Sequence, residues 1–170
     1  MVPHNFAPAA PDESVVHGAC RPGYRTDDPS DHAVNTWIRY MQNEGIERVC
    51  CLLQTKQNQY NRLLEDYDQA FGEDCVCHTP VPDYDTVSGR VLRNDIVPFL
   101  EEADRMNSPV VVHCSAGMGR TGHVLALWLS AKRDYSLGEA IETVRKTGRS
   151  PLEATTKPAL QSLLQAYQGH

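Results

Sequence analysis

The chain has 170 residues, enough for one domain with a sizeable core, and its apolar fraction of 41% and charged fraction of 22% are those of a globular protein. A net charge of −6 argues against a general nucleic-acid binder, and no apolar run approaches the roughly 20 residues of a membrane span. The N-terminus has neither the basic region nor the apolar core of a signal peptide, so we expect a cytoplasmic protein.

The first half of the chain alternates short strands with helices. Residues 1–13 contain three prolines and little periodicity, so we expect an extended N-terminal arm ahead of one domain over residues 14–170. Apolar runs predict strands, and apolar residues at helical spacing predict helices. The predicted strands are 14–20, 48–53 and 75–79, and the predicted helices are 31–44 and 58–71.

The second half continues this alternation. A long helix is expected over 87–106, where Pro98 kinks or divides it. The run 109–112 reads as a buried strand, and 124–129 is apolar on all sides, as in a buried helix. Two more helices are predicted, one that begins at a capping box and ends near residue 147, and one over 158–167. The pattern favours an α/β fold: a mostly parallel central sheet of four to five strands with helices on both sides.

Between the buried strand and the buried helix lies His113-Cys114-Ser115-Ala116-Gly117-Met118-Gly119-Arg120-Thr121-Gly122. Successive backbone N–H groups at such a strand-to-helix loop can cradle an anion, and glycines allow its close approach. The planar fork of Arg120 matches two phosphate oxygens at once. A helix N-terminus and a neighbouring cation also favour the thiolate form of a cysteine such as Cys114. One loop would thus bind an anion and activate a nucleophile.

This stretch resembles the signature of the cysteine-dependent protein phosphatases, His-Cys-x5-Arg-Thr/Ser. The resemblance implies a compact protein-tyrosine or dual-specificity phosphatase that forms a phosphocysteine on Cys114 without a metal or other cofactor. It implies that Thr121 donates a hydrogen bond to the leaving thiolate, and that His113 helps to set the loop and the thiol's ionisation. It further implies a phosphate site made of the Arg120 guanidinium and the backbone amides of Ser115, Ala116, Gly117, Met118, Gly119 and Arg120.

The resemblance also implies a general acid on a loop about thirty residues before the cysteine. The loop 80–88 lies there, and Asp83, which follows an apolar residue and a proline, best matches the position. Asp85 is the alternative, and Glu153 is the next candidate. Because related phosphatases approach the active site with the loop 148–153, Glu153 or Arg149 could contact the substrate or the attacking water.

Another early loop, 21–25, contains two arginines and a tyrosine and reads equally well as a recognition loop or an ordinary exposed loop. The six cysteines suggest buried thiols rather than a disulfide framework or a zinc site. Cys50 or Cys51 could trap an oxidised Cys114 as a disulfide.

The expected partner is a phosphorylated protein or a small phosphoester, bound by a monomer that contacts neither nucleic acid nor membrane. Inositol phosphate, phosphoinositide and RNA 5′-phosphate remain alternative substrates, although the absence of lysine from the signature loop disfavours phosphoinositides. The non-enzymatic alternative is a catalytically silent phosphate-binding module.

Overall fold

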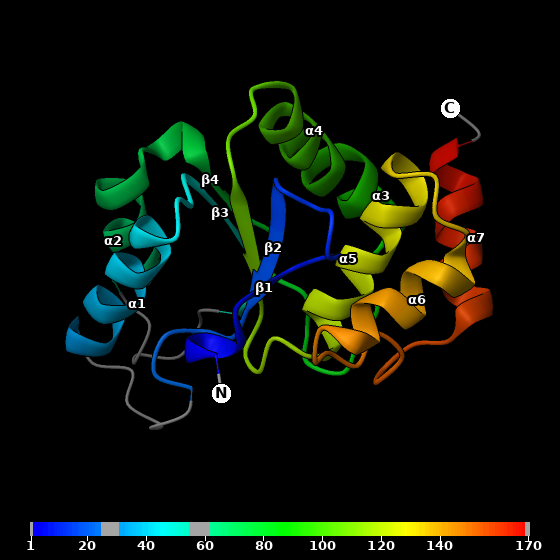
Figure 1. Ribbon diagram of the computed structural model, residues 1–170, viewed down its shortest axis with the longest axis horizontal. Helices are drawn as coiled ribbons and strands as arrows, with labels where there is room; N and C mark the ends of the chain where they lie inside the picture. Colours follow the sequence, from blue (N-terminus) through cyan, green and yellow to red (C-terminus); the bar gives the residue numbers. More distant parts are fainter. Residues whose placement is uncertain (1, 25–30, 55–61, 169–170) are drawn as a thin grey trace.

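The computed structural model of the protein describes residues 2–24, 31–54 and 62–168. Five strands form one sheet in the order β1-β2-β5-β3-β4 (Figure 1). Only the edge pair of β1 with β2 is antiparallel, which confirms the expected mostly parallel sheet. The strands are β1 (Ala7–Pro8), β2 (Val16–Ala19), β3 (Arg48–Cys51), β4 (Val76–His78) and β5 (Val110–His113).

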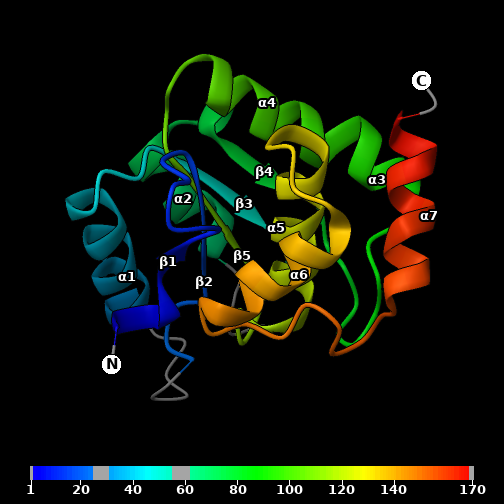
Figure 2. The ribbon, with the colours of Figure 1, turned by 45° about the vertical axis from the view of Figure 1, so that its right-hand side comes forward.

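Helices cover both faces of the sheet (Figures 1 and 2). On one face lie α1 (Asp31–Asn43) and α2 (Leu63–Phe71). On the other lie α3 (Gly89–Val91), α4 (Val97–Arg105) and α5 (Gly119–Lys132), with α6 (Leu137–Lys146) and α7 (Lys157–Gln168) packed beyond α5. Short 3-10 turns are η1 (Pro3–Asn5) and η3 (Glu73–Cys75). No helix in these described ranges is long and apolar enough to cross a membrane.

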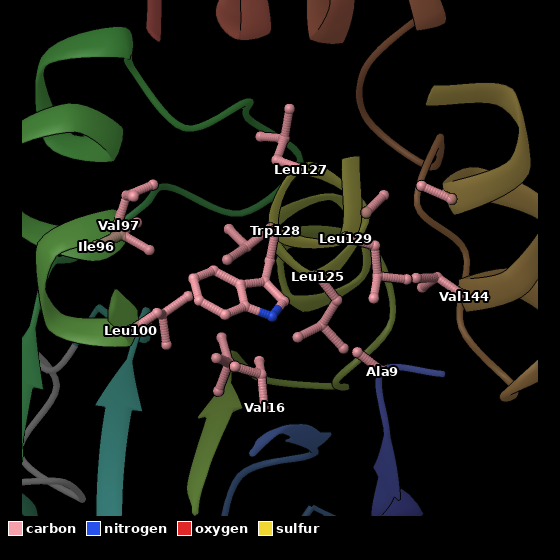
Figure 3. Close-up of a cluster of buried hydrophobic side chains, with 14 of the residues drawn as sticks. Ala9, Val16, Ile96, Val97, Leu100, Leu125, Leu127, Trp128, Leu129 and Val144 are labelled. Carbon is pink, nitrogen blue, oxygen red and sulfur yellow. The ribbon is translucent and has the colours of Figure 1, made fainter. Parts of the chain in front are cut away.

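The helix after the signature loop, α5, is buried on every side because it lies between the sheet and the outer helices. Figure 3 shows Trp128 pointing from α5 towards Val16 of β2 and Leu100 of α4, all of them buried. Burial of one large apolar side chain contributes about 1.5–3 kcal/mol, so this cluster fixes the height of α5 over the sheet. The prediction of a buried helix is confirmed, and the packing of α5 fixes the position of its first turn.

The long helix expected over 87–106 is divided, as Pro98 suggested. A π-helical turn, η4 (Leu92–Ile96), separates α3 from α4 directly before this proline. Proline has no N–H to donate, and its ring crowds the carbonyl four residues earlier, that of Asn94. The wider turn relieves that conflict.

The N-terminal segment packs more closely than an extended arm would. Its described part, residues 2–13, forms η1 and the edge strand β1, and Ala9 and Ala10 are fully buried in the core. The predicted helix at 58–71 is described from Leu63 onward, and its first residues, 58–61, lie outside the described ranges. The division of the chain after residue 13 stays a prediction.

Candidate active site

A pocket of about 190 Å³ opens where the parallel strands end. Parallel sheets bind ligands at the carboxyl ends of their strands, because the loops that follow the strands gather there. The loops after β2, β4 and β5 all reach this pocket, together with the loop after α6. Its lining residues are Tyr24, Asp83, Tyr84, Cys114, Ser115, Ala116, Gly119, Arg120, Glu153 and Ala154.

The phosphate-binding loop, residues 114–119, packs tightly against the end of β2. Gly117 has a φ of 75°, and a Cβ at this position would lie 2.5 Å from the carbonyl oxygen of Ala19. No other residue fits there without moving the loop. The Arg21 amide donates to the carbonyl of Ser115 at 2.9 Å, and Arg21 Nε donates to Ser115 Oγ at 3.3 Å.

The described residues of the early loop 21–25 therefore have different roles. Arg21 is buried and supports the phosphate-binding loop, whereas Tyr24 is 43% exposed and lines the pocket. Arg25 lies outside the described residues.

The nucleophile candidate Cys114 is buried at the base of the pocket, immediately after β5. Its neighbour His113 is fully buried, and Nδ1 of this imidazole lies 2.9 Å from the carbonyl oxygen of Cys114. A carbonyl can only accept, so Nδ1 carries the proton and Nε2 accepts from the Tyr67 hydroxyl at 2.9 Å. Burial lowers the pKa of His113 to about 4, so the ring is neutral at physiological pH. Tyr67, on α2, was not singled out from the sequence.

Arg120, a cation that lines the pocket, is hydrogen-bonded to the loop that carries Asp83 and Asp85. Arg120 is 5% exposed and donates from Nη1 to the carbonyl of Val81 at 2.8 Å. Its Nη2 lies 3.2 Å from Oδ1 of Asp83, whose side chain is 66% exposed. Because water reaches most of this carboxylate, the carboxylate can leave Arg120 and be replaced by a phosphate dianion. Asp85 does not line the pocket, but Glu153 does.

Thr121 occupies the first turn of α5. Its side chain is buried, and within residues 2–24, 31–54 and 62–168 its hydroxyl has no hydrogen-bond partner. A buried hydroxyl without a partner costs free energy unless a ligand or reaction intermediate satisfies it. Its predicted bond to the leaving thiolate of Cys114 stays a prediction.

Arg149 lies behind the phosphate-binding loop rather than in the pocket. Its guanidinium is buried and donates to the carbonyl of Gly117 at 2.6 Å and to that of Asn5 at 2.7 Å. Burial lowers the pKa of Arg149 to about 10, which leaves it charged at neutral pH. The expectation that Arg149 contacts substrate is therefore wrong, because both of its Nη groups donate to backbone carbonyls and the side chain does not line the pocket.

A buried histidine that the sequence analysis did not single out joins α5 to the far end of the acid loop. His123 Nε2 accepts from the Val87 amide at 3.1 Å, and Nδ1 lies 3.0 Å from the Gly119 carbonyl oxygen. Burial lowers the pKa of His123 to about 4. The available signal was one polar side chain at the start of a helix that is otherwise apolar on all sides.

This fold and this pocket define the class of cysteine-dependent phosphatases. Residues 26–133 match the family described as "Polymorphic toxin system, DSP-PTPase phosphatase". This is well over half of the chain, and the chain belongs to that family.

Among individual proteins, the chain is similar to the dual specificity protein phosphatase OPG106 of vaccinia virus (strain Western Reserve), with 36% identity over 62 residues. The match covers 36% of each protein, so the chain spans only about a third of the length of this curated relative. The tyrosine-protein phosphatase cdc-14 of Caenorhabditis elegans is 34% identical over 50 residues, 29% of this chain and 7% of that one.

Solved structures share the fold along nearly the whole chain. The active form of Tk-PTP superposes with a TM-score of 0.71 at 24% identity, over 100% of this chain and 99% of that one. Kinase associated phosphatase, with its catalytic cysteine replaced by serine, gives 0.74 at 19% identity, over 91% and 88%. PTPMT1 in complex with PI(5)P gives 0.69 at 17% identity, over 96% and 97%.

Proposed function

We propose that this protein is a phosphomonoester hydrolase of the protein-tyrosine or dual-specificity type that works through a phosphocysteine on Cys114. One observation carries the proposal: a single pocket unites a cysteine in the loop between β5 and α5, a buried arginine and a carboxylate paired with that arginine. A silent phosphate-binding module would need neither the nucleophile nor the acid.

The first step transfers the phosphoryl group to sulfur. The Cys114 thiolate attacks phosphorus, the bond from phosphorus to the substrate oxygen breaks, and Asp83 gives its proton to that leaving oxygen. The amides of residues 115–120 and the guanidinium of Arg120 hold the other three oxygens, where charge is spread in the transition state. Because the chain itself supplies this positive charge, we infer that no metal or other cofactor takes part.

The second step releases phosphate. Water attacks phosphorus, the Asp83 carboxylate takes a proton from the water, and the sulfur–phosphorus bond breaks to return the Cys114 thiolate. The unpaired hydroxyl of Thr121 donates to that thiolate, which satisfies the buried donor and makes sulfur a better leaving group.

The pocket walls favour phosphotyrosine in a protein substrate. Tyr24 and Tyr84, which are 43% and 67% exposed, stand at the pocket and can flank an aromatic ring. Among the described lining residues, Arg120 is the only cation, beside the carboxylates of Asp83 and Glu153. A second or third phosphate group would meet these carboxylates, so inositol polyphosphates and phosphoinositides fit poorly. A cytoplasmic monomer without affinity for nucleic acid or membranes completes the proposal, consistent with the net charge of −6.

Phosphate release from a phosphotyrosine peptide in the presence of EDTA tests the proposal. We expect turnover by the parent protein and none by Cys114→Ser, because a serine hydroxyl does not ionise near neutral pH. The serine variant should still bind the peptide through the loop. Equal turnover by both proteins would exclude Cys114 as the nucleophile, and inactivity of the parent on every phosphoester would favour the binding module.

The acid is assigned by comparing Asp83→Asn with Asp85→Asn. General acid catalysis contributes about 10²–10⁴-fold, and most where the leaving group is poor. We expect Asp83→Asn to lose activity of this order on phosphotyrosine but much less on an activated aryl phosphate, and to lose the basic limb of the pH profile. Asp85→Asn should stay within a few-fold of the parent. Should neither variant behave so, Glu153 becomes the candidate.

A further inference from the structure

We propose that His123 is a positioning residue for the general acid, because it holds the end of the Asp83 loop against α5 through the backbone of Val87. The inference rests on the proposed function, since it takes Asp83 as the acid that protonates the leaving oxygen. It adds a residue that no part of the phosphatase signature includes.

The loop from Val81 to Val87 is hydrogen-bonded at both ends to side chains from the first two turns of α5. At one end the carbonyl of Val81 accepts from Arg120 Nη1 at 2.8 Å, and at the other the Val87 amide donates to His123 Nε2 at 3.1 Å. Arg120 and His123 are three residues apart, so they lie on one face of the helix. Between these two bonds lies the segment 82–86, whose Asp83 and Tyr84 line the pocket together with residues of the phosphate-binding loop.

The protonation of His123 suits this task. Its Nδ1 faces the carbonyl of Gly119, which can only accept, so Nδ1 holds the proton and Nε2 presents a lone pair to Val87. The side chain is 1% exposed, and both ring nitrogens have partners. A buried polar side chain destabilises a core unless its partners are in place, so the ring also fixes the distance between Gly119 and Val87.

The ends of the segment, Val81 and Val87, are buried in the core, and the bond to His123 fixes the direction of the Val87 peptide there. Tyr84 has a φ of 62°, a left-handed conformation that an L-residue adopts only when its surroundings hold it. Within the segment the Asp85 amide bonds to the Pro82 carbonyl at 3.0 Å, and the carboxylate of Asp83 is 66% exposed. A shift of about 1 Å in a catalytic group costs up to about 10²-fold in rate. Loss of the bond between the Val87 amide and His123 would allow such a shift of Asp83.

Two substitutions separate the two bonds of the imidazole. In His123→Asn the amide can still donate to Gly119 but is too short to reach Val87. In His123→Gln the longer side chain can accept from the Val87 amide. The ratio of kcat/KM on a phosphotyrosine peptide to kcat/KM on an activated aryl phosphate is then measured for each protein, because kcat/KM reports on transfer to Cys114 and not on the later hydrolysis that both substrates share. His17→Asn is the matched control, because it removes a partly buried imidazole of β2 that hydrogen-bonds the Val15 carbonyl and, among the described residues, makes no hydrogen bond with the acid loop.

We expect His123→Asn to lose about 10- to 100-fold in kcat/KM on phosphotyrosine and less than about three-fold on the activated ester, since transfer from the activated ester needs little help from the acid. His123→Gln should recover most of the loss, and His17→Asn should keep the parental ratio. A merely structural role would lower both activities alike or lower only the melting temperature, and either result would overturn the inference.

The outcomes also separate this inference from the proposed function. A parent protein inactive on both esters would refute the phosphatase assignment, whereas an active parent whose ratio is unchanged in His123→Asn would refute only the role of His123. If the asparagine variant does not fold, amide hydrogen exchange in the parent decides. The Val87 amide should exchange slowly, and rapid exchange would show that the bond to His123 does not hold the loop.

Discussion

Replacement of Arg149 by methionine should damage catalysis more than it damages stability. The guanidinium makes two charge-assisted hydrogen bonds, of 2.6 Å to Gly117 and 2.7 Å to Asn5. Each such bond contributes about 1.5–3 kcal/mol, so the two together contribute about 3–6 kcal/mol. Burial opposes them: it lowers the pKa from 12.5 to about 10, which corresponds to about 3 kcal/mol against the charged form.

The balance of these terms leaves a net stabilisation of at most about 3 kcal/mol, and methionine of similar length refills the space. Arg149→Met should therefore lower the free energy of unfolding by no more than about 3 kcal/mol. The loss of kcat/KM should exceed ten-fold, because the freed Gly117 peptide can rotate and the cradle of amides is no longer pre-formed. Arg149→Lys, a point charge in place of a fork, should fall between the parent and the methionine variant.

Urea unfolding gives the stability, and kcat/KM on an activated aryl phosphate reports on the loop with little contribution from the general acid. Gly18→Ala is a second route to the same perturbation, since its Cβ would lie 2.8 Å from the guanidinium carbon of Arg149. A methionine variant with the stability loss but with parental kcat/KM would refute the reasoning, because Arg149 would then stabilise the fold without shaping the phosphate-binding loop.

Three further predictions concern charge, pH and oxidation. Arg120→Lys should lose most activity although the charge stays, because lysine cannot present two parallel donors; kcat within a few-fold of the parent would contradict this. Burial lowers the pKa values of His113 and His123 from 6.5 to about 4, so the unfolded chain binds protons that the folded one does not. The free energy of unfolding should therefore have its full value above pH 6.5 and fall towards pH 4 by about 3 kcal/mol for each ring. His123→Gln should remove about half of this pH dependence, as measured by urea unfolding at each pH. An unchanged pH dependence would refute the linkage. Burial raises the pKa of the Cys51 thiol to about 12, so its thiolate is scarce. Trapping of oxidised Cys114 by Cys51 should hence be slow at pH 7 and faster at pH 9 in peptide mapping after mild peroxide, and pH-independent yields would argue against it.

The sequence by itself determined the parts of this protein that depend on neighbouring residues. A β-branched run, a loop with glycines and an apolar stretch are enough to predict β5, the phosphate-binding loop and α5, because each reports a local conformational preference. The same holds for the division of the long helix at Pro98, which follows from the missing N–H. The alternation of such elements also predicted the mostly parallel sheet, since parallel strands need helical crossovers.

Tertiary structure alone decided which side chains meet. Spacing cannot show that Asp83 reaches the pocket while Asp85, two residues on, does not line it. It also cannot show that Arg149 turns away from substrate towards the carbonyl of Gly117, 32 residues earlier. The bond between His123 and Val87 joins residues 36 apart, and its geometry depends on the height of α5 over the sheet, which the packing of its apolar side chains sets. Local preference acts over a turn or a strand, whereas these contacts exist only once the whole core is assembled.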